Sequence, residues 1–208
     1  MEKIIITIDR QYGSGGREIG ERVAELLAIP SYDKEFVTLA AESDATMDEA
    51  TLEKVDERAT NSLLYTLVMG AGASHGIAGH AHSMSLNDRL FAKQSTLIRE
   101  LAEKSSAVMI GRCADYVLRE NKSRLSVFIY ADLADRKARV CKRQSVSESE
   151  AIDLINKTDR RRASYYNFYT GGKWGKYDNY HLAINSSTLG IEGTAKLIAD
   201  MARLYLEK

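Results

Sequence analysis

The sequence predicts an α/β fold in which a parallel sheet is covered by helices on both faces. Residues 4–8 form an unbroken β-branched run, which is typical of a strand buried on both faces. Further candidates for buried strands lie at residues 107–110, 126–130 and 181–184. A helical pattern follows each strand, and this alternation is typical of right-handed βαβ units and a parallel sheet.

The length and composition fit one globular domain without a strong charge. The chain has 208 residues, of which 44% are hydrophobic, so we expect a single domain over residues 1–208. Basic and acidic residues balance at 29 each, which gives no indication of a nucleic-acid polymer or a membrane surface as partner. There is no secretory signal pattern, no apolar run long enough to cross a bilayer and no paired cysteine motif, so we expect a cytoplasmic protein.

The helices also have local signals. Apolar residues between residues 19 and 27 recur at the spacing of one helical face. Pro30 follows this helix, and a short second strand is predicted at residues 31–33. Acidic residues around Asp132 indicate a helix start, and residues 147–150 match a capping box.

The segment before residue 84 is harder to interpret. Charged residues dominate residues 43–59, which favours a solvated helix, and residues 60–69 have enough apolar surface for the core or for a homodimer contact. Residues 70–83 are poor in bulky side chains, which predicts a loop. Its histidines could in principle bind a metal ion, but with no cysteine or supporting carboxylate nearby we favour a polar, flexible loop. These histidines are His75, His80 and His82.

A glycine-rich turn between the first strand and the first helix has the context of a phosphate-binding loop. Glycines let backbone N–H groups point inward, and the helix N-terminus adds partial positive charge. The small residues of the turn are Gly13, Ser14, Gly15 and Gly16.

The turn departs from the pattern G-x-x-x-x-G-K-[ST]. With Gly15 as the second glycine, Arg10 stands at the first glycine, Gly16 at the lysine and Arg17 at the Ser/Thr position. Two interpretations stay open. Either Arg17 supplies the missing positive charge to a terminal phosphate and Ser14 or a water binds a magnesium ion, or the glycines serve only the backbone geometry of a tight turn.

Four segments of the chain match one known pattern. They are ITIDRQYGSGGREIG at residues 6–20, YDKE at 32–35, IGRCAD at 110–115 and YY at 165–166. With them the sequence resembles the cytidylate kinase-like family, a divergent branch of the nucleoside monophosphate kinases, over nearly its whole length. The resemblance implies a three-layer P-loop kinase fold with a five-stranded parallel sheet. It also implies an acceptor-binding region at about residues 33–105 and a helical lid at about residues 147–175.

The resemblance further implies roles for single residues. Asp33 would contact the acceptor nucleoside and Arg112 would bind its phosphate, at a strand end where ligands of open α/β sheets bind. Arg139 and Arg143 would pack on the donor base and approach its phosphates. Their spacing places Arg136 on the same helix face, where a solvated basic surface is the alternative interpretation.

The lid region contributes three arginines. They are Arg160, Arg161 and Arg162. Lid arginines neutralise the transferred phosphoryl group and exclude water on closure, and Arg162 best matches the family spacing from Asp159. Aromatic residues crowd residues 165–180, where anchoring the lid to the core is favoured over stacking on a base. The candidates for catalysis are Arg17, Arg112 and Arg162.

The function that follows from the resemblance is transfer of the γ-phosphoryl group of Mg-ATP to a nucleoside monophosphate, with CMP or dCMP as the first candidate. Such transfer needs positioning and electrostatics rather than a covalent nucleophile, and the sequence shows no convincing Ser-His-Asp or Cys-His arrangement. One alternative is a kinase of the same fold for another small acceptor. The other is a nucleotide-binding regulatory protein that has lost turnover, as the missing lysine could indicate.

Overall fold

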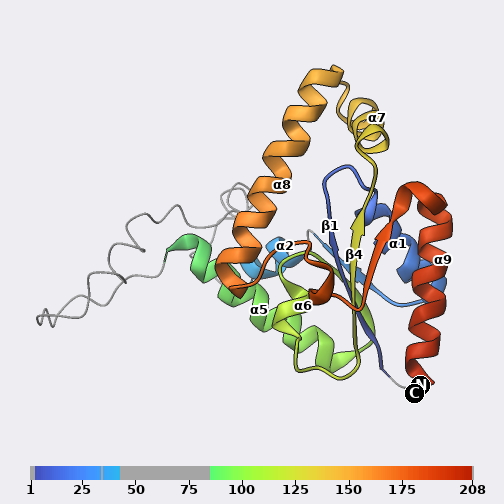
Figure 1. Cartoon of the computed structure of the whole chain (residues 1–208). Coiled ribbons are helices and arrows are strands. Elements are labelled where there is room, and N and C mark those ends of the chain that lie inside the picture. The colour runs from blue at the N-terminus through green and yellow to red at the C-terminus, as the bar shows by residue number, and fades with distance from the viewer. Residues whose placement is uncertain (1–2, 34, 43–84, 208) are drawn as a thin grey trace, which may run out of the picture.

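The computed structural model describes residues 3–33, 35–42 and 85–207 (Figure 1). Its strands are β1 (Ile5–Arg10), β2 (Ser31–Tyr32), β3 (Ala107–Ile110), β4 (Arg124–Tyr130) and β5 (Leu182–Asn185). All of them pair in parallel in the order β2-β3-β1-β4-β5. The expected five-stranded parallel sheet is therefore confirmed, with β1 at its centre.

The helices cover both faces of this sheet. They are α1 (Gly16–Leu27), α2 (Glu35–Glu42), α5 (Leu86–Lys104), α6 (Ala114–Val117), α7 (Leu133–Gln144), α8 (Glu148–Thr170) and α9 (Ser186–Leu206). Figure 1 shows α1 and α9 on one side and α2, α5 and α6 on the other. Among the described residues, no helix combines the length and apolar composition needed to span a membrane.

The core lies on both sides of β1, as its unbroken β-branched run predicts. Ile6 and Ile8 pack with α1 and α9, whereas Ile5 packs on the opposite face with Phe36 of α2 and Ile98 of α5. All of these side chains are essentially buried. Because side chains alternate along a strand, burial on both faces requires apolar residues at successive positions.

Two helix starts can be compared with their predictions. Ser147 and Glu150 form the expected capping box of α8, with both reciprocal hydrogen bonds present. Asp132 lies at the N-cap of α7, but its side chain makes no capping bond and instead accepts a hydrogen bond from Asn185 Nδ2 at 2.9 Å. The expectations for residues 43–59, 60–69 and 70–83 lie outside the described residues.

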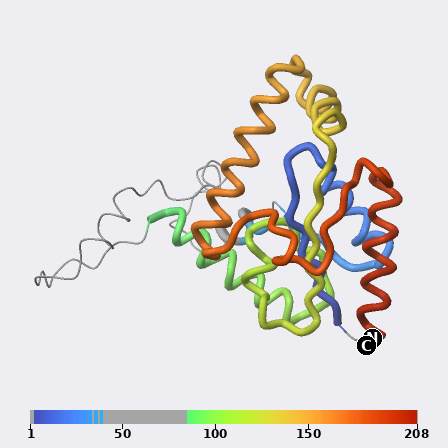
Figure 2. The backbone as a smooth tube through the Cα atoms, viewed as in Figure 1, coloured from blue at the N-terminus to red at the C-terminus, as the bar shows by residue number. Residues whose placement is uncertain are grey.

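Helices α7 and α8 lie beyond the carboxyl ends of the central strands, and α8 runs back to α5 (Figure 2). Its lower end is anchored by aromatic contacts: the ring of Tyr169 stacks on that of Phe91 with centroids 4.0 Å apart. Trp174 packs edge-on against Phe128 of β4. The anchoring interpretation of the aromatic residues is thus confirmed for these side chains, while Phe168 and Tyr177 stay exposed.

Candidate phosphate-binding site

A cavity of about 1230 Å³ opens at the carboxyl ends of the central strands. It is lined by the glycine-rich turn, the start of α1, the ends of β2 and β3, and one face each of α7 and α8. Every site residue predicted from the sequence lines this cavity except Ser14 and Arg160. The structure therefore brings together residues that are up to about 150 positions apart in the chain.

The backbone conformation and the close packing of the glycine-rich turn require glycine. Gly13 and Gly15 have φ values of 80° and 79°, in the left-handed region that side chains other than glycine rarely adopt. A Cβ atom at Gly13 would lie 2.9 Å from the carbonyl oxygen of Arg136. The turn leads directly into α1, so the N-terminus of this helix lies at the cavity wall.

Ser14 lies inside the turn rather than on the cavity wall. Its side chain is fully buried, and its hydroxyl donates to the carbonyl oxygen of Gln11 at 2.9 Å while accepting from the N–H of Gly16 at 3.3 Å. Magnesium binding by Ser14 stays a prediction, and it would require this buried hydroxyl to become accessible from the cavity.

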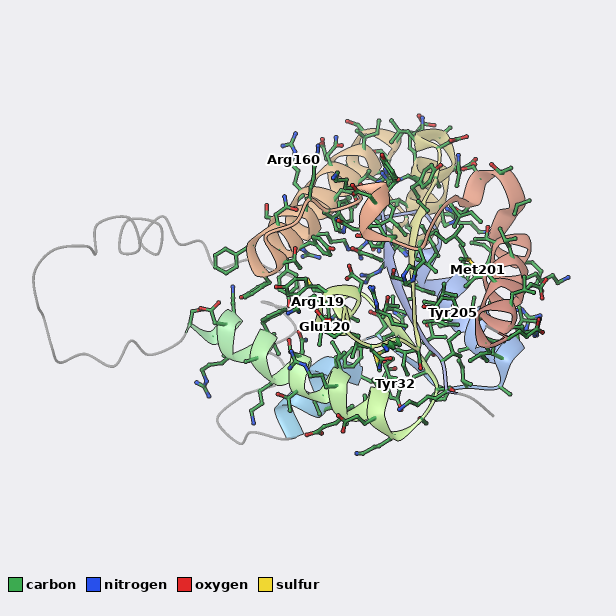
Figure 3. All side chains as sticks on the ribbon, turned by 60° about the horizontal axis from the view of Figure 1, so that its bottom comes forward. Tyr32, Arg119, Glu120, Arg160, Met201 and Tyr205 are labelled. Atoms are coloured by element: carbon green, nitrogen blue, oxygen red, sulfur yellow. The ribbon has the colours of Figure 1, made fainter. Side chains whose placement is uncertain are left out.

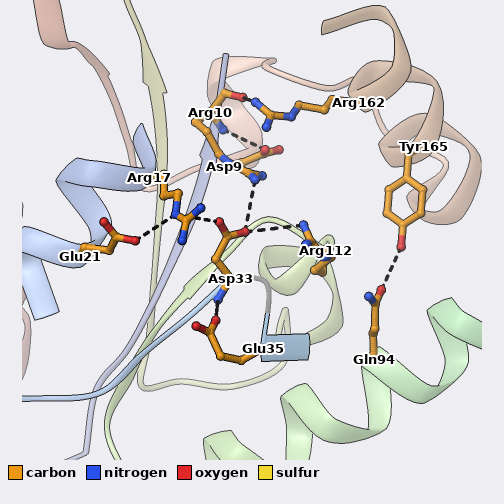
Figure 4. A network of polar contacts seen from close by, with 10 residues as sticks. All are labelled: Asp9, Arg10, Arg17, Glu21, Asp33, Glu35, Gln94, Arg112, Arg162 and Tyr165. Carbon is orange, nitrogen blue, oxygen red and sulfur yellow. Dashed lines mark hydrogen bonds and ion pairs between the residues drawn. The ribbon is translucent and has the colours of Figure 1, made fainter. Parts of the chain in front are cut away.

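Three guanidinium groups surround the carboxylate of Asp33 (Figure 4). The distances from its oxygens to nitrogen atoms are 3.3 Å for Arg17, 3.6 Å for Arg10 and 3.8 Å for Arg112. The backbone N–H of Asp33 donates to Glu35 Oε2 at 2.7 Å. Burial acts to raise the pKa of Glu35, but this N–H, the N–H of Glu35 itself and the charges of Arg17 and Arg112 outweigh burial and hold that pKa below its usual value.

Arg10 is a site residue that the sequence interpretation did not assign. It ends β1, it is 6% exposed, and it lines the cavity. The available signal was a basic residue at a position where phosphate-binding loops carry glycine. Arg17, which was assigned the missing charge, lies nearer the rim: its side chain is 47% exposed and also pairs with Glu21 at 2.9 Å. This bond, more than any other interaction, raises the pKa of Arg17 above its usual value.

The segment between β3 and α6 directs Arg112 into the cavity. Gly111, Arg112 and Cys113 have φ values of 76°, 57° and 54°, and Arg112 is 4% exposed. Residues other than glycine rarely adopt a left-handed backbone conformation, and those that do concentrate at functional sites. The expected position of Arg112 at the carboxyl end of a strand agrees with this geometry, whereas its contact with an acceptor stays a prediction.

Arg136 connects three parts of the site and is 7% exposed. Its Nε donates to the carbonyl oxygen of Tyr12 at 2.8 Å, and its other end pairs with Asp159 of α8. Asp159 in turn accepts the N–H of Tyr12 at 2.7 Å. The interpretation of Arg136 as part of a solvated surface is wrong, because these partners bury it between α7, α8 and the turn.

Three further arginines of α7 and α8 line the cavity and contact the segment between β1 and α1. Arg139 donates a hydrogen bond to the carbonyl oxygen of Gly13, and the guanidinium of Arg143 lies 4.9 Å from the ring centroid of Tyr12. From α8, Arg162 donates to the carbonyl oxygen of Arg10 at 3.0 Å. Helix α8 therefore contacts the end of β1, just before the turn.

The remaining lid arginines differ in their positions. Arg161 is exposed but lines the cavity, whereas Arg160 is exposed and lies on the outer side of α8 (Figure 3). The expectation that only some of the three arginines point inward agrees with these positions. That α8 moves as a lid stays a prediction.

A buried polar cluster lies behind the cavity wall and was not assigned from the sequence. Tyr180 donates to Asp9 Oδ2 at 3.0 Å, and Tyr166 donates to Asp115 Oδ2 at 2.8 Å. Burial, and then the charge of Asp9, raise the pKa of Asp115 to about 7, against the opposing hydrogen bond from Tyr166. Through these bonds, Tyr180 links the segment before β5 to β1, which ends at Arg10. Tyr166 links α8 to α6, which begins just after Arg112.

Comparisons with known proteins agree on the fold. The chain matches the cytidylate kinase-like family over residues 5–188. An uncharacterized protein from Eubacterium ventriosum superposes with a TM-score of 0.71 at 27% sequence identity, covering 97% of this chain and 99% of that one. Shikimate kinase from Bacteroides thetaiotaomicron superposes with a TM-score of 0.51 at 15% identity, covering 97% and 99%. The second likeness concerns the fold alone, and no curated protein matches the chain significantly.

Proposed function

The chain belongs to the cytidylate kinase-like family, and from this membership and the geometry of the cavity we propose that it transfers the γ-phosphoryl group of ATP to a nucleoside monophosphate, with CMP or dCMP as the first candidate. The observation that carries the proposal is the convergence of Arg10, Arg17 and Arg112 on Asp33 next to a glycine-rich turn. One cavity thus combines a turn suited to a triphosphate with an arginine cluster suited to a second anion.

The donor side is formed by the turn and α7. Backbone N–H groups and the N-terminus of α1 would bind the terminal phosphates of ATP, because both present partial positive charge to an anion. Arg139 and Arg143 lie above the turn, where they would reach the donor nucleotide. Mg²⁺ would enter with ATP as part of the substrate, supplying charge neutralisation on the phosphates. Among the described residues, no group of three or more His, Cys, Asp or Glu side chains could hold a metal ion by itself.

The acceptor side is formed by Asp33 and Arg112. In the free protein Asp33 holds the surrounding guanidinium groups in place, and an acceptor phosphate would take over part of these contacts. An arginine binds phosphate through two parallel hydrogen bonds. An oxygen of the acceptor phosphate would then attack the γ-phosphorus of ATP, and the bond between that phosphorus and ADP would break.

Charge on the transferred group would be neutralised from α8. Arg161 and Arg162 line the cavity on this side. Preorganised donors in a site shielded from water stabilise the developing charge more strongly than water does. The docking of α8 on the turn would provide this shielding.

The test uses the whole chain with Mg-ATP and a panel of CMP, dCMP, UMP, AMP and GMP, together with small hydroxyl acceptors that carry no phosphate. ADP release should depend on the acceptor and should be largest with CMP or dCMP. Arg112→Ala should lower the turnover by about 100-fold or more, as loss of one charged donor at such a site does. The matched control is Arg22→Ala, because Arg22 is a solvent-facing arginine of α1 outside the cavity.

Two outcomes would contradict the proposal, and a third would contradict the role of Arg112 in it. Turnover of a small acceptor other than a monophosphate would indicate a kinase of the same fold with another substrate. ATP binding without transfer to any acceptor would favour the regulatory alternative, for which the missing lysine is the supporting observation. Equal turnover in Arg112→Ala and Arg22→Ala would show that Arg112 does not bind the acceptor.

A further inference from the structure

The glycine-rich turn carries a glycine and a basic residue at exchanged positions. In the ordinary pattern, the first position is glycine and the seventh is lysine. Here the first is Arg10 and the seventh is Gly16. A lost lysine would leave one position changed, whereas in this chain both positions have changed in opposite directions.

The structure shows that these positions share one space. A Cβ atom at Gly16 would lie 2.5 Å from the Cβ of Arg10 and 2.9 Å from its Cγ. Separations below about 3 Å are essentially never tolerated between such atoms. Gly16 is the first residue of α1 and, unlike Gly13 and Gly15, it does not have a positive φ. Glycine at this position is therefore required by the side chain of Arg10 rather than by the backbone.

The side chain of Arg10 reaches from the start of α1 to the acceptor side of the site. This side chain is 7% exposed, and one of its nitrogens is 3.6 Å from Asp33, the residue that Arg112 also approaches (Figure 4). The carbonyl oxygen of Arg10 accepts the hydrogen bond from Arg162 of α8. Arg10 thus contacts the acceptor side and α8 while its stem covers the start of α1.

We propose that Arg10 takes over the role of the missing lysine and binds the γ-phosphate of ATP from the end of β1. This inference rests on the proposed function. Arg10 would stay charged throughout, because guanidinium groups do not lose their proton in proteins. While the bond from the γ-phosphorus to ADP breaks and the bond to the acceptor oxygen forms, it would donate hydrogen bonds to oxygens of the transferred group. Arg17, which is half exposed and paired with Glu21, is then not the replacement.

The main experiment compares Arg10→Met, Arg10→Lys and the exchange variant Arg10→Gly with Gly16→Lys. Arg10→Met should lower kcat by about 100-fold or more and should remove most of the preference for binding ATP over ADP. Arg10→Lys should retain more activity than Arg10→Met. The exchange variant should recover more than about tenfold of the activity lost in Arg10→Met, because it restores the first glycine and the lysine of the ordinary pattern. Arg22→Met is the matched control and should behave as the unmodified chain.

Thermal unfolding tests the shared space without reference to activity. Gly16→Lys alone should lower Tm markedly, because its Cβ would overlap Arg10. In the exchange variant this loss should largely disappear, giving a coupling that two independent positions would not show. Additive losses in Tm would overturn the shared-space argument.

The outcomes separate this inference from the proposed function. If the unmodified chain transfers phosphate and Arg10→Met does so equally well, the inference is overturned and the proposed function stands. If the unmodified chain transfers nothing, the proposed function fails. The affinities for ATP and ADP then test whether Arg10 contacts the γ-phosphate. A preference for ATP over ADP that is lost in Arg10→Met supports its contact with the γ-phosphate, whereas an unchanged preference, or no nucleotide binding at all, refutes it.

Discussion

Loss of the charge on Asp159 should detach α8 from the glycine-rich turn and destabilise the fold. Asp159→Asn keeps the side-chain shape and an oxygen that can accept the N–H of Tyr12, but it removes the charge opposite Arg136. The side chains of Arg136 and Asp159 are 8% and 19% exposed. Breaking a buried pair by removing one partner costs about 3–5 kcal/mol, and the partial exposure of Asp159 lowers our expectation to about 2–4 kcal/mol. For a chain of this size, this corresponds to a fall in Tm of about 5–15 °C.

Chemical denaturation of a double-mutant cycle measures this pair directly. The cycle contains Asp159→Asn, Arg136→Met and their combination, and it should give a coupling energy of about 1–3 kcal/mol. Asp153→Asn, an exposed carboxylate on the same helix, is the control and should change the free energy of unfolding by less than about 0.5 kcal/mol. If Asp159→Asn were as mild as this control, the role of the pair in holding α8 on the turn would be refuted.

Two further predictions concern the turn and the buried cluster. In Gly15→Ala, a residue with φ 79° would place its Cβ 2.3 Å from Ile191 Cδ1, so we expect a loss of about 1–3 kcal/mol in the free energy of unfolding and weaker ATP binding by calorimetry; unchanged values would refute the strain. The pKa of Asp115 is raised from 3.8 to about 7 in the folded protein, so the folded state binds this proton more tightly than the unfolded state does. Proton binding at Asp115 therefore stabilises the fold fully below about pH 4, and this contribution is lost as the pH rises towards 7. Denaturation curves across this range should show a smaller fall in stability with rising pH for Asp115→Asn, and an equal fall in both proteins would contradict the assignment.

The parts of the fold that the sequence predicts are those with a local cause. Strands β1, β3 and β4 lie close to their predicted ranges because each is buried and therefore largely apolar at successive positions. Strand β5 also lies close to its predicted range, although only Ile184 of its residues is buried. The capping box at Ser147 and Glu150 is equally local, since both of its hydrogen bonds join residues three apart. The glycine-rich turn belongs to the same class, because its backbone geometry is fixed by residue type.

The charged contacts of the site have no local cause and could not be predicted in this way. Strand β1 continues beyond its apolar run to Asp9 and Arg10, and both are buried. Arg136 likewise resembles a surface arginine in sequence, because its partner Asp159 lies 23 positions away on another helix. The resemblance to a family indicated Asp33 and Arg112 separately. Only the strand order β2-β3-β1 places their strand ends, and that of Arg10, at neighbouring positions on one edge.

The charge of the cavity differs strongly from that of the chain, which has equal numbers of acidic and basic residues. The described residues that line the cavity include eight Arg or Lys side chains but four Asp or Glu side chains. Mg-ATP and a phosphate monoester each carry about two negative charges near neutral pH, so both together would balance this local excess. A neutral or singly charged acceptor would leave positive charges uncompensated around Asp33, where burial makes such charges costly. The balance of charge therefore supports a phosphate-bearing acceptor over an uncharged one.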